Sequence, residues 1–270
     1  MKIDVIGGYG VIGTEMQARR FMAGHEVAYY NRQALDIMKD FDKIRQLNSD
    51  LIINLAVDKN PENIYTSVNS LGVKNLRENT DIKILHLSTD YVFDGKRGHY
   101  SFDDHVCAIN NYGASKILGE NELSDNDIIV RTSWIMSKNG GFYKKIADKM
   151  LTQSKIEVVC NRYGSPTSAA YLIKYIELVC QDILVGRSAS QSLSLYDLFR
   201  KQINHCVNLG VASWFDVACE IAKIEKYHGE IVPIAYEKTT QDMPRPINTS
   251  LRPSFSLAKQ SSWQEALWQL

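Results

Sequence analysis

The residues best suited to proton chemistry are Tyr112 and Lys116, four positions apart at the start of a predicted helix, residues 114–123. Side chains at this spacing project from one face of a helix. A phenol beside an ammonium group loses its proton more easily, because the positive charge favours the phenolate. The pair therefore predicts a general acid, Tyr112, with its pKa lowered by Lys116.

The alternative is coincidence, since tyrosine and lysine are common on surface helices. Of the 14 tyrosines, however, only Tyr112 has a lysine four residues later. Upstream, a predicted strand at residues 83–87 ends at Ser88 and Thr89. Hydroxyls at the carboxyl end of a buried strand face the crevice in which open α/β sheets bind ligands, so Thr89 joins the candidate site.

A glycine turn at the amino terminus predicts the binding site of a dinucleotide. Residues 2–6 form a β-branched run that breaks into Gly7, Gly10 and Gly13, and residues 14–22 read as a helix. The first glycine permits a tight turn, the second lets the backbone approach a pyrophosphate, and the third lets the helix pack on the strand. The helix amino terminus offers unpaired N–H groups to the anion.

The second predicted strand, residues 25–30, indicates which dinucleotide is bound. Folds that prefer NAD place an acid near the end of this strand, but Asn31 and Arg32 stand here. An arginine at this point can bind a 2′-phosphate, so we expect NADPH, with NADH as a second option. The alternative is that Arg32 is only a solvated loop residue. Asp36 and Ile37 follow and are expected to flank the adenine.

Strands and helices continue to alternate along the chain, and near-continuous apolar strands such as residues 50–56 and 128–131 predict a parallel sheet covered on both faces. We expect an α/β fold, a Rossmann-type doubly wound parallel sheet with a small carboxyl-terminal substrate-binding lobe. Residues 1–155 would form mainly the dinucleotide domain and residues 156–270 mainly the lobe, with interleaving allowed. Residues 188–194 are serine-rich and predict an exposed loop, and Ser213 is a natural N-cap for a helix reaching about residue 226.

Two further residues are candidates for the substrate site. Trp134 follows the strand at residues 128–131 and is well placed to wall a pocket, with plain core packing as the alternative. Arg245 lies in a non-helical Arg-Pro step and could pair with a diphosphate, although a solvated charge is an equal alternative.

Composition excludes several classes of function. The 270 residues carry 31 basic and 31 acidic side chains without a basic cluster, so we expect no nucleic acid partner. Five cysteines show no ligand spacing and are expected to be buried free thiols, with no metal site. We see no signal peptide and no membrane-spanning run, and expect a cytoplasmic protein; a homodimer is left open.

Together the motifs resemble the dTDP-4-dehydrorhamnose reductase family of the extended short-chain dehydrogenases. The resemblance covers nearly the whole chain and is carried by residues 7–13, 88–95, 112–120, 131–134, 164–167, 213–215 and 245–251. It implies that Thr89, Tyr112 and Lys116 are catalytic and that Asp90 and Trp134 contact the sugar nucleotide. It also implies cofactor contacts from the glycine turn, including Val11 and Ile12, and from Leu55 and Ala56.

The chain departs from the family pattern in three places, which bear on the sugar more than on the chemistry. Val57 and Asp58 follow Ala56 directly, where the family has a longer alanine-rich loop; prolines between residues 98 and 112 are replaced; and the end after Arg252 is abbreviated.

The activity expected from the resemblance is NADPH-dependent reduction of the C4 ketone of a nucleotide-linked 4-keto-6-deoxy sugar, first of all dTDP-4-dehydrorhamnose to dTDP-L-rhamnose in polysaccharide biosynthesis. One alternative is a non-catalytic NADP-binding regulatory subunit, because the chain also resembles the β subunit of methionine adenosyltransferase. The other is a nucleotide-sugar epimerase.

Overall fold

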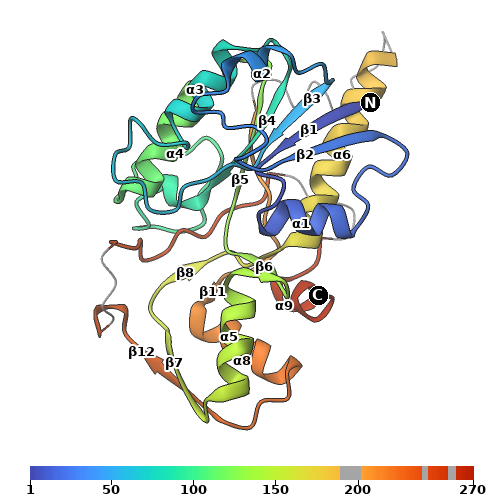
Figure 1. Cartoon of the computed structure of the whole chain (residues 1–270). Helices are drawn as coiled ribbons and strands as arrows, with labels where there is room; N and C mark the ends of the chain where they lie inside the picture. The colour runs from blue at the N-terminus through green and yellow to red at the C-terminus, as the bar shows by residue number, and fades with distance from the viewer. Residues whose placement is uncertain (189–201, 239–242, 255–259) are drawn as a thin grey trace.

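The computed structural model describes residues 1–188, 202–238, 243–254 and 260–270 (Figure 1). Its main sheet has six strands, all parallel, in the order β10-β5-β4-β3-β1-β2. The strands are β1 (Lys2–Ile6), β2 (Glu26–Tyr30), β3 (Leu51–Asn54), β4 (Ile84–Thr89), β5 (Ile128–Thr132) and β10 (Gln202–His205). The predicted serine-rich loop lies outside the described residues, apart from Ser188.

Helices cover both faces of this sheet, which explains the near-continuous apolar strands. In β1, Ile3 and Val5 pack into one core with Ile176 of α6, whereas Ile6 packs into a second core with Leu76 of α3. Figure 1 shows α1 and α6 on one side and α2, α3 and α4 on the other. Their bounds are α1 (Val11–Ala18), α2 (Phe41–Arg45), α3 (Leu71–Glu78), α4 (Asn111–Asn121) and α6 (Ala169–Ser188). The predicted doubly wound Rossmann-type fold is confirmed.

A smaller lobe packs at the carboxyl end of the sheet, around a separate core that includes Tyr143, Ile156 and Val217 (Figure 1). Its elements are β6 (Ile135–Ser137), α5 (Gly141–Thr152), β7 (Lys155–Val159), β8 (Tyr163–Gly164), β9 (Thr167–Ser168), β11 (Ala212–Ser213), α8 (Trp214–Ile224), β12 (Glu230–Ile234) and α9 (Trp263–Trp268). Ser213 caps α8 as predicted, in a capping box with Asp216.

The two lobes interleave in sequence. The chain leaves the main sheet after β5 to build β6 and α5, well before residue 155. It then returns, because α6 packs against α1 and β10 pairs with β5. The expected boundary between residues 155 and 156 is therefore only approximate, because segments on each side of it contribute to both lobes.

Two helices begin earlier than the sequence suggested. Helix α1 starts at Val11 and ends at Ala18, because Arg20 and Met22 then adopt positive φ of 52°. Helix α4 starts at Asn111, because the side chain of Asn110 accepts a hydrogen bond from the N–H of Gly113. Short 3₁₀ helices occupy Asp90–Val92 and Tyr236–Lys238.

All five cysteines are free, but only Cys180 and Cys206 are buried, so the expectation of five buried thiols was wrong for the other three. Among the described helices, none is long and apolar enough to cross a membrane.

Candidate active site

A cleft of about 460 Å³ lies between the main sheet and the smaller lobe and contains the predicted chemistry. It brings together the glycine turn, the carboxyl end of β4, the start of α4 and three aromatic side chains of the smaller lobe. The residues that line it are Gly7, Gly10, Val11, Ile12, Gly13, Leu55, Val57, Lys59, Leu87, Ser88, Thr89, Asp90, Tyr112, Lys116, Thr132, Trp134, Ile135, Gly141, Phe142 and Trp214.

Tyr112 lines this cleft and has a strongly raised pKa. Burial raises the pKa of its phenol, a hydrogen bond with Thr89 opposes that rise, and the negative charge of Asp90 adds to it. The net shift is upward, so the expectation of a lowered pKa for Tyr112 is wrong in this structure. The physical reason is that desolvation of a buried phenolate outweighs the nearby polar groups.

The Lys116 side chain is bound to two residues of β4. Its Nζ lies 2.9 Å from His86 Nε2 and donates to the Leu87 carbonyl at 2.7 Å. Burial lowers the pKa of Lys116 to about 8, and the negative charge of Glu120 opposes this shift. The sequence did not indicate His86, because it lies 30 positions upstream on a strand whose apolar neighbours suggested only core packing.

Asp90 is held by hydroxyl groups from three segments. Its Oδ2 accepts from Ser133 Oγ at 2.9 Å and from Thr249 Oγ1, and its Oδ1 accepts from Thr89 Oγ1 at 3.2 Å. Burial raises the pKa of Asp90 to about 6, and the hydroxyl hydrogen bonds oppose that rise. Asp90 thus lines the cleft as predicted, but it also ties the smaller lobe and the tail to β4.

Aromatic side chains form the wall of the cleft on the side of the smaller lobe. Trp134 stacks on Trp214 with ring centroids 3.5 Å apart, and Phe142 lies 4.3 Å from Trp214. The backbone of Trp134 has a positive φ of 41°, and the indole Nε1 is buried without a hydrogen-bond partner. Trp134 is therefore a wall residue, and the sequence missed that Trp214 and Phe142 complete the wall.

The glycine turn has little room for side chains. Gly7 has φ of 76°, and a Cβ there would lie 2.7 Å from the Ala56 nitrogen. At Gly13 a Cβ would lie 2.2 Å from the Gly8 carbonyl oxygen, so only glycine lets α1 pack this closely. The amino terminus of α1 consequently faces the cleft with its free N–H groups, which suits an anion.

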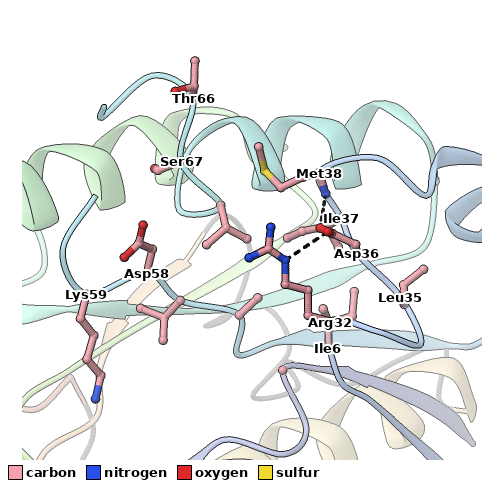
Figure 2. Close-up of a pocket in the computed structure, with 14 residues that line it drawn as sticks. Ile6, Arg32, Leu35, Asp36, Ile37, Met38, Asp58, Lys59, Thr66 and Ser67 are labelled. Atoms are coloured by element: carbon pink, nitrogen blue, oxygen red, sulfur yellow. Dashed lines mark hydrogen bonds and ion pairs between the residues drawn. The ribbon is translucent and has the colours of Figure 1, made fainter. Parts of the chain in front are cut away.

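A second pocket of about 600 Å³ adjoins the cleft, and Gly7, Val57 and Lys59 line both. Figure 2 shows the Arg32 guanidinium reaching Asp36, with Nε 3.1 Å from Oδ2. The residues that line this pocket are Ile6, Gly7, Arg32, Leu35, Asp36, Ile37, Met38, Ala56, Val57, Asp58, Lys59, Thr66, Ser67 and Val68.

Two predicted site residues do not line either cavity. Asn31 accepts a hydrogen bond from the N–H of Ala34 at 2.9 Å and so caps its own turn. Arg245 lies with Nη1 3.5 Å from the Tyr91 hydroxyl, and its Nε is buried without a partner. Lys59, which directly follows the shortened loop and was not among the predicted site residues, lines both cavities.

Comparison with known proteins gives one consistent family. Residues 1–270 match the family model described as RmlD substrate binding domain. The chain is 32% identical over 295 residues to dTDP-4-dehydrorhamnose reductase of Aggregatibacter actinomycetemcomitans, covering 98% of this chain and 97% of that one. It is 35% identical over 231 residues to the enzyme of the same name from Sinorhizobium fredii, covering 79% and 75%.

Solved structures of dTDP-4-dehydrorhamnose reductases have the same fold as this chain. A dTDP-4-dehydrorhamnose reductase from Clostridium acetobutylicum superposes with a TM-score of 0.85 at 27% identity, over 100% of this chain and 98% of that one. The Bacillus anthracis dTDP-4-dehydrorhamnose reductase, solved in complex with NADP, gives a TM-score of 0.87 at 24% identity over 99% and 97%, which shows the shared fold.

Proposed function

The chain belongs to the family described as RmlD substrate binding domain, and on that premise we propose that it is a reductase that uses NADPH to reduce the C4 ketone of a nucleotide-linked 4-keto-6-deoxy sugar. The observation that carries this proposal is the single cleft in which Thr89, Tyr112 and Lys116 meet the glycine turn. Relatives named dTDP-4-dehydrorhamnose reductase make dTDP-4-dehydrorhamnose the first candidate substrate.

Tyr112 is the proton donor in this proposal. A reduction needs a donor that keeps its proton until charge develops on the carbonyl oxygen, and the raised pKa keeps the phenol protonated at neutral pH. Thr89 lies beside it, and its hydroxyl, which donates to Asp90 Oδ1 in this structure, would turn to donate to the same oxygen when the substrate binds. When bound, the nicotinamide supplies the hydride.

The remaining cleft residues suit the two ends of a dinucleotide. The amino terminus of α1, which begins at Val11, would hold a diphosphate, because the N–H groups of a helix's first turn lack partners within the helix; the Gly10 N–H itself donates to the Gly7 carbonyl at 3.0 Å. Arg32 and Lys59 border the second pocket and would attract the negative charge of a 2′-phosphate. Asp36 and Ile37 would flank the adenine end. The Bacillus anthracis relative is a complex with NADP, which supports this choice of cofactor.

The sugar nucleotide would lie on the side of the smaller lobe. The stacked rings of Trp134 and Trp214 offer an apolar wall for it. Arg245 lines neither cavity and its Nε is buried, so a contact with the diphosphate would require this side chain to turn toward the cleft. Asp90 would contact the sugar through Oδ1, which accepts one hydrogen bond, from Thr89, whereas Oδ2 already accepts from both Ser133 and Thr249. A homodimer and a cytoplasmic location remain predictions.

The test is a screen of NADPH oxidation with 4-keto-6-deoxy sugars on several nucleotides, with the Tyr112→Phe variant as control. We expect turnover with the dTDP-linked ketone and little in the variant. Tight NADPH binding without turnover on any ketone would contradict the proposal and favour the regulatory-subunit alternative. Exchange of sugar stereochemistry without net NADPH oxidation would favour the epimerase.

A further inference from the structure

A polar contact joins the helix beside the glycine turn to the smaller lobe, and the proposed reaction does not use it. Glu15 lies on α1 and is 6% exposed, and its partner Ser137 is 0% exposed. Glu15 Oε1 accepts from Ser137 Oγ at 2.6 Å and from Asn139 Nδ2 at 2.8 Å. Ser137 ends β6 and Asn139 lies in the turn after it, so the contact crosses from one lobe to the other (Figure 1).

Glu15 makes this contact as a carboxylate. Burial favours the neutral acid, but the hydrogen bonds from Ser137 and Asn139, together with Arg19, oppose burial and hold the pKa of Glu15 below its ordinary value. A carboxylate can only accept, so the Ser137 hydroxyl is the donor. The hydroxyl oxygen is then left to accept from the Asn139 backbone N–H, at 3.0 Å. Glu15 thus orients Ser137 and, through it, the start of the turn.

The turn that is tied to α1 carries part of the cleft wall. Antiparallel bridges pair Met136 with Gly141 and Ser137 with Gly140, so the chain reverses tightly after β6. Gly141 and the next residue, Phe142, line the cleft. A shift of this turn would therefore move the wall.

The same turn also packs against the first residue of α1. A Cβ at Gly140 would lie 2.6 Å from Val11 Cγ2, so the backbone of the turn lies close against that side chain. Val11 and Gly141 both line the cleft, whereas Glu15 and Ser137 do not. An effect of Glu15 on a bound ligand therefore has to pass through the position of the turn.

We propose that Glu15 is a positioning residue that fixes the turn after β6 on α1, and so sets the distance between the cofactor and the wall that receives the sugar nucleotide. The inference rests on the proposed function, which assigns these two ligands to the two sides of the cleft. Asp90 ties the smaller lobe to β4 through Ser133, and Glu15 adds a second tie at α1. Reacting atoms need to lie about 3–3.5 Å apart, so a wall displaced by about 1 Å lowers turnover.

The first test compares Glu15→Ala with Glu15→Gln. Alanine removes both hydrogen bonds to the turn, whereas the amide oxygen of glutamine can accept from Ser137 and Asn139. We expect Glu15→Ala to lower kcat/KM for the sugar nucleotide about 10–100-fold and Glu15→Gln to stay near wild type. The Kd for NADPH should change little in either variant, because Gln17 Nε2 still donates to the Gly8 carbonyl at 2.8 Å and holds the glycine turn. Steady-state kinetics and fluorescence titration measure the two effects.

Ser137→Ala removes the same contact from the other lobe. It should reproduce the effect of Glu15→Ala, and the double variant should be no worse than either single variant, because the effects of two partners in one contact do not add. The matched control is Arg19→Ala, which removes the other partner of the Glu15 carboxylate, with Nε 3.3 Å from Oε2, and leaves the smaller lobe untouched. It should change neither kcat/KM nor the Kd for NADPH.

Hydrogen exchange examines the turn without any sugar substrate. In Glu15→Ala the amides of residues 138–142 should exchange about tenfold faster than in the wild type, while those of residues 7–13 keep their rate. Glu15→Gln should restore slow exchange. This measurement needs no turnover, so a failure of the proposed reductase activity is recorded separately.

Wild-type kcat/KM or wild-type exchange in Glu15→Ala would overturn the inference. An equal loss of NADPH and sugar-nucleotide binding would also overturn it, because Glu15 would then only stabilise α1. The same holds if Glu15→Gln is as impaired as Glu15→Ala. If Glu15→Ala does not fold, Ser137→Ala decides by the same measurements.

Discussion

Cofactor preference should depend on Arg32 and on the acid beside it. The Arg32 side chain is 83% exposed and is tethered to the nearly buried Asp36 at 3.1 Å. An exposed ion pair contributes roughly 0.2–1 kcal/mol, less than the roughly 1.5–3 kcal/mol of a desolvated charge-assisted hydrogen bond. A 2′-phosphate carries nearly two negative charges, so we take about 1.4 kcal/mol for its contact with Arg32, which is about a tenfold preference for NADPH.

Arg32→Ala should therefore raise the Michaelis constant for NADPH about tenfold while leaving that for NADH almost unchanged. Asp36→Asn should do the opposite and strengthen the preference, because it removes a carboxylate that repels the phosphate. The asparagine keeps an oxygen to accept from the Met38 N–H, as Asp36 does at 3.0 Å, so the turn survives. Steady-state kinetics with both cofactors measure both effects.

The matched control is Arg45→Ala, which removes another exposed arginine paired with a nearby carboxylate, Asp42 at 2.8 Å, outside both cavities. It should change neither Michaelis constant. A full NADPH preference in Arg32→Ala, or a weaker preference in Asp36→Asn, would refute the reasoning and leave Arg32 as a solvated loop residue.

Three further predictions concern the cleft. Tyr112→Phe should lower turnover by roughly 10²–10⁴-fold with NADPH affinity nearly unchanged, as stopped-flow kinetics and fluorescence titration can show; near wild-type turnover would exclude it as the proton donor. The pKa of Asp90 is raised from 3.8 to about 6, so its stabilising contribution is present below pH 3.8 and is lost as the pH rises through 6. Urea unfolding of Asp90→Asn should show a smaller loss of stability across that window, and an unchanged pH dependence would contradict the assignment. Gly164→Ala would place a methyl group 2.5 Å from Trp134 Cε2, so overpacking should cost about 1–3 kcal/mol of stability. Displacement of Trp134 should also raise the Michaelis constant for the sugar nucleotide. An unchanged Michaelis constant together with unchanged tryptophan fluorescence would contradict this prediction.

The sequence alone determined the features that arise from short spacings. Glycines three residues apart after a β-branched strand specify the turn before α1, because a larger side chain at Gly13 would clash with the backbone of Gly8. Apolar residues in unbroken runs specify strands buried on both faces. The four-residue spacing of Tyr112 and Lys116 placed both in one cleft. The pair of Arg32 and Asp36 has the same spacing and was also within reach of the sequence.

Only the tertiary structure decided what the site residues contact and which protonation state they favour. Lys116 turns to His86, Asp90 takes a hydroxyl from Thr249, and Trp134 stacks on Trp214, and all three contacts join residues at least 30 positions apart. Such contacts depend on how the lobes pack, which no local spacing encodes. The same packing removes water from the phenol of Tyr112, and desolvation then shifts its pKa upward, against the direction that the neighbouring lysine suggests.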